Sequence, residues 1–320
     1  MLEWYDAAHR DLPWRRSKRF YRVWISEVML QQTRVEAVIP YYHRFLERFP
    51  DVAALAAAPE QEVLAAWSGL GYYSRARSLH KGAKQIAATG FPQTYAALRA
   101  LPGAGPYTAA AVASIALGLP HAAVDGNVIR VIARLTNDAS EISRSTARRR
   151  FEAQAESLLH PRRPGDFNQA MMELGATICI PRAPRCPDCP VARFCAARGA
   201  GRERQLPVKR AKQATRDVPL DLVLLEDRQG IFLIQRPSRE RRLPGFWELP
   251  EKKSLAGIRC RLAREFSHRI VNDHLLVKVW KARVGKAAPP PALPKGRWFD
   301  RRELSLIPVT TITRKALLAE

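Results

Sequence analysis

Four cysteines lie close together in the second half of the chain, and their thiols are suited to hold an inorganic group. Zinc ribbons usually pair two Cys-x2-Cys knuckles, whereas here one such knuckle is flanked by longer arms. Ligand type alone leaves zinc open as an alternative to an iron–sulfur cluster. The spacing is Cys179-x6-Cys186-x2-Cys189-x5-Cys195, and the fifth cysteine, Cys260, lies outside it and is most simply a structural thiol.

Two carboxylates stand in uncharged surroundings, which makes them candidates for acid–base chemistry. Glu27 is the only charged residue between Val23 and Thr33, in a helical segment that is otherwise nearly all apolar. Burial raises the pKa of such a carboxyl, which suits a general acid near neutral pH. Asp125 ends a long stretch that contains no Asp, Glu, Lys or Arg. Structural roles are the alternatives: Glu27 can pair with an arginine such as Arg15, and Asp125 can cap the helix that follows it.

A glycine-rich turn before a helix is a candidate phosphate site. Gly103 and Gly105 allow the backbone to approach a ligand, and a helix is expected from about Pro106 to Leu117. The first amides of such a helix are unpaired and carry the positive end of its dipole, so they can bind one phosphate. The alternative is an ordinary joint between two helices.

Net charge and composition narrow the class of protein. Lys plus Arg number 53 and Asp plus Glu 30, a net charge of +23, which favours a polyanionic partner such as nucleic acid. A basic solvated surface is the alternative. Met1 begins directly in an amphipathic helix, and no span lacks both charges and helix breakers. We therefore expect no signal peptide, no membrane partner and a soluble, intracellular protein. Clustered cysteines also argue against a secreted disulfide framework.

The first two-thirds of the chain has the pattern of an all-α protein, because apolar positions recur at helical spacing between Gly and Pro breaks. The predicted helices are Glu3–His9, Tyr21–Thr33, Ala37–Phe49, Pro59–Ser68, Arg75–Thr89, Tyr95–Ala100, Pro106–Leu117, Val128–Leu135, Ser145–Leu158 and Asp166–Ala176.

The composition changes after Cys195, which predicts a second, α+β domain behind a basic, Pro-flanked linker. A turn around Asp227–Gly230 predicts a hairpin between the first two strands. The expected elements are strands at Leu220–Leu225, Ile231–Gln235 and Leu275–Val284, an exposed loop at Pro289–Pro294, and short helices at Arg301–Ile307 and Ile312–Leu318.

An ordered series of motifs resembles the helix-hairpin-helix DNA glycosylase superfamily that includes endonuclease III, and within it the adenine DNA glycosylases of the MutY type. The resemblance covers nearly all of residues 3–198. Its motifs are Leu12–Arg15, Ser26–Thr33 (SEVMLQQT), Gly69–Arg77 (GLGYYSRAR), Leu101–Val128 with its Gly/Pro-rich loop ending in Asp125, Phe167–Gly175 (FNQAMMELG) and the cysteine spacing.

The resemblance implies a mechanism of adenine excision from DNA. Glu27 matches the residue that protonates adenine at N7, and Asp125 matches the one that stabilises or captures the positive charge developing on the sugar. Asn127 and Tyr107 would orient these groups. Bifunctional glycosylase-lyases carry a Lys at position 107, whose amine forms a Schiff base with the sugar. The tyrosine therefore implies a monofunctional enzyme, and an endonuclease III-like pyrimidine glycosylase-lyase is the rival reading.

Further positions match residues that bind the flipped base and the DNA in the family. Arg15 belongs to the segment that lines the adenine pocket, and Gln169 matches a position facing adenine. Gln32 matches the residue that fills the gap left by the extruded base, and Tyr72 matches a wedge beside the lesion base. The Gly103/Gly105 hairpin would hold the phosphate backbone.

The cysteine spacing resembles the [4Fe-4S] loop of the superfamily, which implies a cubane with four cysteine ligands. A non-enzymatic iron–sulfur module that binds DNA is a second rival, but it would need neither carboxylate.

The C-terminal part resembles, more weakly, the Nudix-like lesion-reading domain of the same family, on Leu243–Pro250 and on Phe266-Ser267-His268. The acidic metal-binding helix of active Nudix hydrolases is missing, so we predict recognition of the lesion base without pyrophosphatase chemistry. The alternative is that Phe266-Ser267-His268 is only a connecting turn.

These inferences predict an all-α glycosylase domain with an iron–sulfur loop and a C-terminal α+β Nudix-like domain. The boundaries expected are 1–199 for the helical domain, with a six-helix module at about 21–125 and an iron–sulfur module at about 1–20 and 126–199, then a linker at 200–218 and the second domain at 219–320. The predicted substrate is adenine mispaired with 8-oxoguanine or guanine in duplex DNA. We expect a monomer in the cytoplasm, of bacterial type and associated with the nucleoid through DNA.

Overall fold

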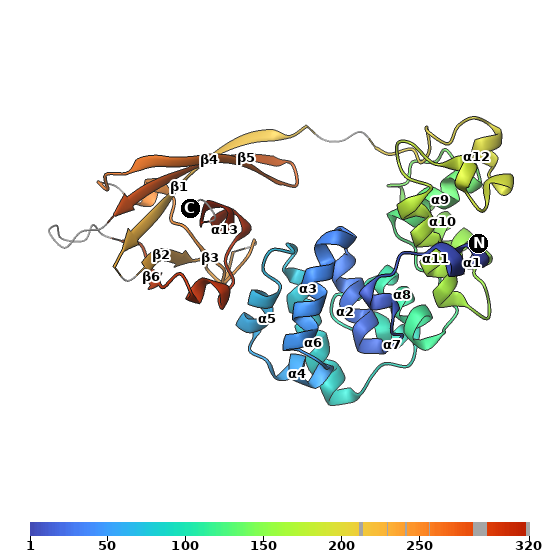
Figure 1. Cartoon of the computed structure of the whole chain (residues 1–320), viewed down its shortest axis with the longest axis horizontal. Coiled ribbons are helices and arrows are strands. Elements are labelled where there is room, and N and C mark those ends of the chain that lie inside the picture. The colour runs from blue at the N-terminus through green and yellow to red at the C-terminus, as the bar shows by residue number, and fades with distance from the viewer. Residues whose placement is uncertain (211–213, 229, 241, 256, 284–292, 318–320) are drawn as a thin grey trace. The chain divides into compact units, whose positions relative to one another are not determined.

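Helices make up the first part of the chain and a mixed sheet the last part (Figure 1). The computed structural model describes residues 1–210, 214–228, 230–240, 242–255, 257–283 and 293–317. Two units are distinguished, one made of Met1–Ala56 with Lys81–Ala211 and the other of Ala57–His80 with Lys212–Glu320. In the described residues no helix is both long enough and apolar enough to cross a membrane.

The helices lie close to their predicted positions. Their bounds are α1 Leu2–Ala8, α2 Phe20–Leu30, α3 Val35–Arg48, α4 Val52–Ala57, α5 Glu60–Ala66, α6 Ser74–Thr89, α7 Tyr95–Arg99, α8 Pro106–Leu117, α9 Gly126–Leu135, α10 Ser145–Leu158, α11 Pro164–Thr177 and α12 Ala196–Gly199, with short 3-10 turns η1 Pro13–Arg15, η2 Cys186–Asp188 and η3 Ala192–Phe194.

Two helices of the first unit begin or end at residues that the sequence identifies as helix boundaries. α8 begins with Pro106, which needs no amide partner there, and ends at Gly118 in the left-handed conformation with φ +68°. α9 begins behind the capping residue Asp125. Helix α8 packs against α2 and α11, and α11 packs against α9 and against α1, which lies beside it in Figure 1.

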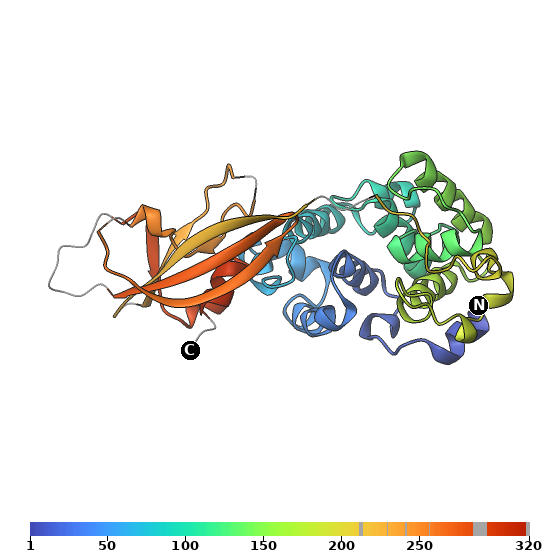
Figure 2. The same ribbon diagram turned by 90° about the horizontal axis from the view of Figure 1, so that it is seen from above.

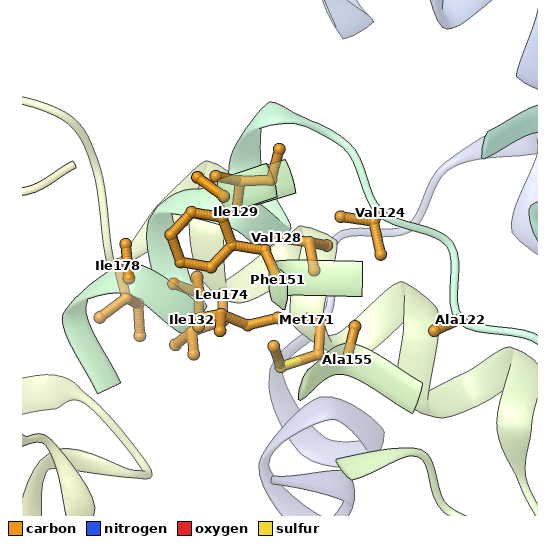
Figure 3. Packing of buried hydrophobic residues seen from close by; sticks show 13 residues of the cluster. Ala122, Val124, Val128, Ile129, Ile132, Phe151, Ala155, Met171, Leu174 and Ile178 are labelled. Carbon is orange, nitrogen blue, oxygen red and sulfur yellow. The ribbon is translucent and has the colours of Figure 1, made fainter. Parts of the chain in front are cut away.

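The apolar faces of α9, α10 and α11 form one hydrophobic core. Figure 3 shows the Phe151 ring among Ile129, Ile132 and Leu174. Phe151, Ile132 and Leu174 are fully buried. Partly buried Cys179 and Cys189 pack against the same cluster, so this core supports the cysteine loop.

The second unit contains a mixed sheet with the strand order β3-β2-β1-β5-β4, in which β6 pairs with β2. β1 and β5 are parallel, whereas β4 and β5 form an antiparallel hairpin. Figure 2 shows β1, β4 and β5 as long twisted ribbons. The strands are β1 Arg216–Asp227, β2 Gly230–Gln235, β3 Trp247–Glu248, β4 Arg261–Ile270, β5 Asp273–Arg283 and β6 Gly296–Phe299, and the short elements are η4 Lys252–Ser254, η5 Glu303–Ser305 and α13 Thr311–Leu317.

Side chains alternate between the two faces of this sheet, as the strand period requires. Leu222 and Leu224 of β1 join a core that also contacts α13 residues. Val223 and Leu225 join a second core on the opposite face. The predicted α+β class of this part is therefore confirmed.

Several predicted elements need correction. β4 was not predicted, and its residues Phe266–His268 form a strand where a loop was expected. β1 begins at Arg216, inside the predicted linker, because Arg216–Leu220 pair with Asp273–Val277 of β5. Helix α4 was also missed, and at Arg301–Ile307 only the single turn η5 is present. Most of the predicted loop Pro289–Pro294 lies outside the described residues.

Candidate active site

Glu27 lies on α2, a helix with mostly buried residues, and is itself 5% exposed. Its Oε2 accepts a hydrogen bond of 2.7 Å from the Tyr107 hydroxyl, which also contacts the Met172 sulfur at 3.2 Å. Burial raises the pKa of Glu27 to about 7, the Tyr107 hydrogen bond opposes this rise, and the charge of Asp125 adds to it. A carboxyl that keeps its proton near neutral pH can act as a general acid.

Asp125 is the N-cap of α9 and is held rigidly by backbone amides. Its Oδ1 accepts hydrogen bonds from the amides of Asn127 and Val128 at 2.9 and 2.8 Å, and its Oδ2 accepts one from the Asn127 side chain at 2.8 Å. Burial raises the pKa of Asp125 above its ordinary value, and these three hydrogen bonds and Arg130 oppose the rise without cancelling it. The cap role considered from the sequence is thus present, and it also fixes the direction of the carboxylate.

Asn127 connects Asp125 to the cysteine loop through a buried arginine. Arg130 donates from Nη2 to the Asn127 side-chain oxygen at 2.8 Å and from Nε to the Cys179 carbonyl oxygen at 2.8 Å. The same Nη2 donates to the Gly175 carbonyl oxygen at 2.7 Å. A side chain on Gly175 would clash, since a Cβ there would lie 2.6 Å from Asn127 Cβ. The orientation of Asn127 is therefore determined by α11 and the cysteine loop together.

Asn168 holds the loop that leads into Asp125. This residue of α11 is 3% exposed. Its Nδ2 donates to Ser114 Oγ and to the His121 carbonyl oxygen, both at 2.8 Å, and its Oδ1 accepts from the Ala123 amide at 3.0 Å. These three contacts fix the position from which Asp125 starts α9.

Arg15 does not pair with Glu27, and in the described residues Glu27 has no ion pair. The guanidinium of Arg15 instead donates to Glu173 at 2.8 Å, and its side chain is 11% exposed. Arg15 still lies close enough to Glu27 to lower its pKa. Gln169, the second expected adenine contact, is half-buried on α11, and its side chain makes no hydrogen bond with the described residues.

The two residues expected to enter the DNA helix share an unusual backbone conformation. Gln32 has φ +57° and Tyr72 has φ +49°, the left-handed region that side chains other than glycine rarely occupy. Gln32 is exposed, and Tyr72 is 55% exposed although it is a large aromatic residue. Such strain is typical of functional positions. The two residues belong to different units, and each is described here by itself.

The glycine turn before α8 is present as expected. The backbone at position 103 has φ +75°, a conformation that favours glycine. Gly105 is the N-cap of α8 with φ −67°, and a Cβ at this position would have no atom within 4 Å. No side chain caps α8. Its first amides are therefore open to an anionic ligand.

The cysteine loop has the composition expected of a cluster site. Cys179, Cys186, Cys189 and Cys195 line one cavity with Arg134 and Arg198. Arg134 is 1% exposed and donates from Nη1 to Cys179 Sγ at 3.2 Å and to the Ile180 carbonyl oxygen at 2.8 Å.

A single metal ion needs ligand atoms that lie close together. In the described part of the chain, no three His, Cys, Asp or Glu side chains are placed to hold one metal ion. Sulfurs that share a single zinc would lie about 3.8 Å apart, because each Zn–S bond is about 2.3 Å. All four thiols line one cavity, and burial raises the pKa of Cys186 and Cys189.

Phe266, Ser267 and His268 do not converge on one ligand. They are successive residues of β4, so their side chains alternate between the sheet faces. Phe266 packs against the core that contacts α13, and His268 lies 3.4 Å from Lys315 of that helix. Ser267 points to the other face and is exposed.

The site is positioned by four buried polar residues that the sequence motifs did not indicate: Arg130, Arg134, Asn168 and Glu173. For the two arginines a signal was available, because they are the only charged residues of the apolar segment from Val128 to Leu135. The same criterion had singled out Glu27. Glu173 and Asn168 had no comparable signal, since their partners lie far away in the sequence.

Known proteins with similar sequences identify the family of this chain. A family model described as "HhH-GPD superfamily base excision DNA repair protein" matches residues 25–156. Adenine DNA glycosylase of Homo sapiens is 44% identical over 230 residues, which are 68% of this chain and 42% of that protein. Adenine DNA glycosylase of Buchnera aphidicola subsp. Acyrthosiphon pisum (strain APS) is 34% identical over 75% of this chain and 70% of that protein. The chain belongs to the adenine DNA glycosylase family.

Solved structures of related glycosylases match the helical part of this family member. A thermostable thymine-DNA glycosylase aligns with a TM-score of 0.57 and 29% identity over 62% of this chain and 93% of that chain. A trapped endonuclease III–DNA covalent intermediate aligns with a TM-score of 0.53 and 25% identity over 62% of this chain and 92% of that chain. The family and fold inferred from the motifs are thus confirmed. The chain spans less than half of the length of the human and rat relatives.

Proposed function

We propose that this chain is a monofunctional DNA glycosylase that excises adenine mispaired with 8-oxoguanine or guanine in duplex DNA. The main support is the contrast between two carboxylates of one unit. Glu27 is buried, its carboxylate accepts a hydrogen bond from the Tyr107 phenol and from no other described residue, and burial raises its pKa to about 7. Asp125 instead accepts three hydrogen bonds at a helix N-terminus. An acid and a stabilising anion are the pair that N-glycosidic hydrolysis needs.

The mechanism begins with extrusion of adenine from the stack, because its glycosidic bond is otherwise inaccessible. Glu27 transfers its proton to adenine N7, and the bonding electrons leave with the base as the C1′–N9 bond breaks. The Asp125 carboxylate stabilises the positive charge that develops at C1′. Water then adds its oxygen to C1′ and gives up a proton, and an abasic site remains. Tyr107 and Asn127 keep the two carboxylates in place.

DNA contacts are proposed for residues whose geometry suits them. The open amides of α8 behind Gly103 would bind a backbone phosphate, and the exposed Gln32 and Tyr72 would occupy the disrupted stack. Gln169 offers an unpaired amide to the flipped base. We also propose residues 1–199 as the glycosylase domain and a Nudix-like lesion-reading domain that was expected at 219–320 and starts with β1 at Arg216. The protein would act as a monomer on DNA in the cytoplasm.

The decisive experiment incubates the protein with duplexes that carry adenine opposite 8-oxoguanine, guanine, cytosine or thymine. Adenine release is expected opposite 8-oxoguanine and guanine, with product strands that stay intact until alkali or heat is applied. No lysine stands at position 107 to form a Schiff base, so borohydride should trap little covalent complex. Strand cleavage without alkali, or release of pyrimidines, would instead assign the chain to glycosylase-lyases.

A [4Fe-4S] cluster is the proposed cofactor, held by Cys179, Cys186, Cys189 and Cys195. The donor set of four thiols around one cavity, with an arginine N–H on one sulfur, fits such a group. When bound, it would cross-link the loop that holds Arg130 and Arg134. Anaerobically purified protein is expected to contain about four irons per chain, as a cubane on four cysteines requires. Stoichiometric zinc without iron would contradict the assignment.

Recognition of the lesion base is proposed for Ser267, whose hydroxyl can accept a hydrogen bond from N7–H of 8-oxoguanine. Because Ser267 and His268 point to opposite faces of the sheet, only one of them can reach that base edge. Ser267→Ala is expected to narrow the preference for 8-oxoguanine over guanine by about tenfold, whereas His268→Ala leaves it unchanged. Competition between the two duplexes at one salt concentration measures this. If Ser267→Ala and His268→Ala change the preference for 8-oxoguanine equally, a direct contact between Ser267 and the base edge is excluded.

A further inference from the structure

We propose that Glu173 is a positioning residue for the general acid: it holds Arg15 and thereby limits the positive charge that reaches Glu27. This inference rests on the proposed role of Glu27. Glu173 touches neither Glu27 nor Asp125, and its action is through the arginine.

Glu173 is the centre of a two-arginine clamp. Its Oε1 accepts hydrogen bonds from the Arg10 amide at 3.1 Å and from Arg10 Nε at 2.8 Å. Its Oε2 accepts from Arg10 Nη2 at 2.9 Å and from Arg15 Nη2 at 2.8 Å. The carboxylate is 1% exposed, and the side chain of Arg10 is 35% exposed. Burial alone would raise the pKa of Glu173, but the bonds from both arginines lower it to about 2, so it is charged at any working pH.

The clamp fixes where the charge of Arg15 lies. Its second guanidinium nitrogen, Nη1, donates to the Arg10 carbonyl oxygen at 3.1 Å, and the group stands over the Tyr5 ring at 5.5 Å from its centroid. These contacts leave the guanidinium with partners on several sides, and none of them is Glu27.

Three elements present ionisable groups to Glu27. η1 supplies Arg15, α8 supplies Tyr107, and the start of α9 supplies Asp125, while α11 contributes the uncharged sulfur of Met172 through Tyr107. Arg15 is the positive member of this set. An uncompensated guanidinium near a carboxyl favours its ionised form, which would deprive the site of its acid.

A buried ion pair of this kind is not well explained by stability alone. Desolvation of both charges offsets most of their attraction, so an apolar pair of similar volume is often as stable. The pair has another effect, because the negative charge of Glu173 lies 2.8 Å from the Arg15 guanidinium and offsets its positive charge. Glu173 thus helps Glu27 to keep its proton near neutral pH.

Matched variants separate this electrostatic role from a structural one. Glu173→Gln removes the negative charge and keeps an acceptor for Arg15, whereas Arg10→Gln removes a positive charge from the same clamp. Both weaken the clamp, but they change the field at Glu27 in opposite directions. Glu173→Gln is expected to lower the midpoint of Glu27 titration by about half a pH unit, and Arg10→Gln to raise it by less. Glu173→Asp keeps the charge and should restore the wild-type midpoint.

Carbon-13 NMR of carboxyl-labelled protein measures the midpoint directly, with the Glu27 signal assigned by its loss in Glu27→Gln. This readout does not require any excision activity. Single-turnover excision against pH provides the second readout, in which the alkaline limb should move with the NMR midpoint. Midpoints that move in the same direction in the two variants, or not at all, would overturn the role of Glu173. An unchanged rate in Glu27→Gln would instead refute the proposed function, whatever the titration shows.

Discussion

Asp125→Asn is expected to lower the single-turnover rate of adenine excision by about a thousandfold, the usual effect of removing one group that stabilises charge in the transition state. Asparagine can accept the same backbone bonds from Asn127 and Val128, and it is as good an N-cap as aspartate. The variant should therefore fold and bind mispaired DNA normally. The variant loses the negative charge proposed to face C1′ and the hydrogen bond that Oδ2 accepts from the Asn127 side chain, because an amide nitrogen cannot accept it. The main effect should still fall on the chemical step.

A matched control is available in Asp138→Asn. Asp138 also accepts a backbone hydrogen bond, from the Ser140 amide at 2.8 Å, but its carboxylate pairs with Arg150 and it contacts neither Glu27 nor Asp125 in the described residues. Its loss should leave excision unchanged. An Asp125→Asn variant with near-normal excision, measured with enzyme in excess over duplex, would remove Asp125 from the mechanism.

Glu27→Gln should also lower the single-turnover rate of adenine excision, by about a hundred- to ten-thousandfold, because general acid catalysis typically contributes that much. Glutamine preserves the shape and can still accept the Tyr107 hydrogen bond, but it has no proton to give to N7. In the wild-type protein, excision should fall as the pH rises through about 7, where Glu27 loses its proton.

The stability of the Glu27→Gln variant provides the control for this loss. The pKa of Glu27 is raised in the folded protein from 4.5 to about 7, so the folded state binds the proton more tightly. Stability of the wild-type protein therefore falls between those two pH values and stays reduced above them. Glutamine avoids this cost, and at pH 8 the variant should be more stable, by at most roughly 3 to 4 kcal/mol. A lower Tm at pH 8 would mean that the lost activity reflects damaged folding.

The catalytic candidates could be found from the sequence because their signals are local. Glu27 and Asp125 stand out as charges within uncharged segments, and the cysteines stand out by their spacing. The helices were predicted for the same reason, since helical hydrogen bonds and apolar periodicity join residues three or four apart. The cap of α9 by Asp125 is of this kind, and it was recognised beforehand as an alternative to catalysis.

What the sequence by itself could not determine is which distant side chains meet. Glu173 lies 158 residues from Arg15, and Asn168 lies 45 residues from the Ala123 amide that it holds. No periodicity links such pairs, because they form only when helices from different parts of the chain pack together. Strand β4 was missed for a related reason: its backbone partners lie on β5, and only this pairing decides that Ser267 and His268 face opposite sides. The sequence thus determined which groups can do chemistry, and the tertiary structure decided which charges and faces surround them.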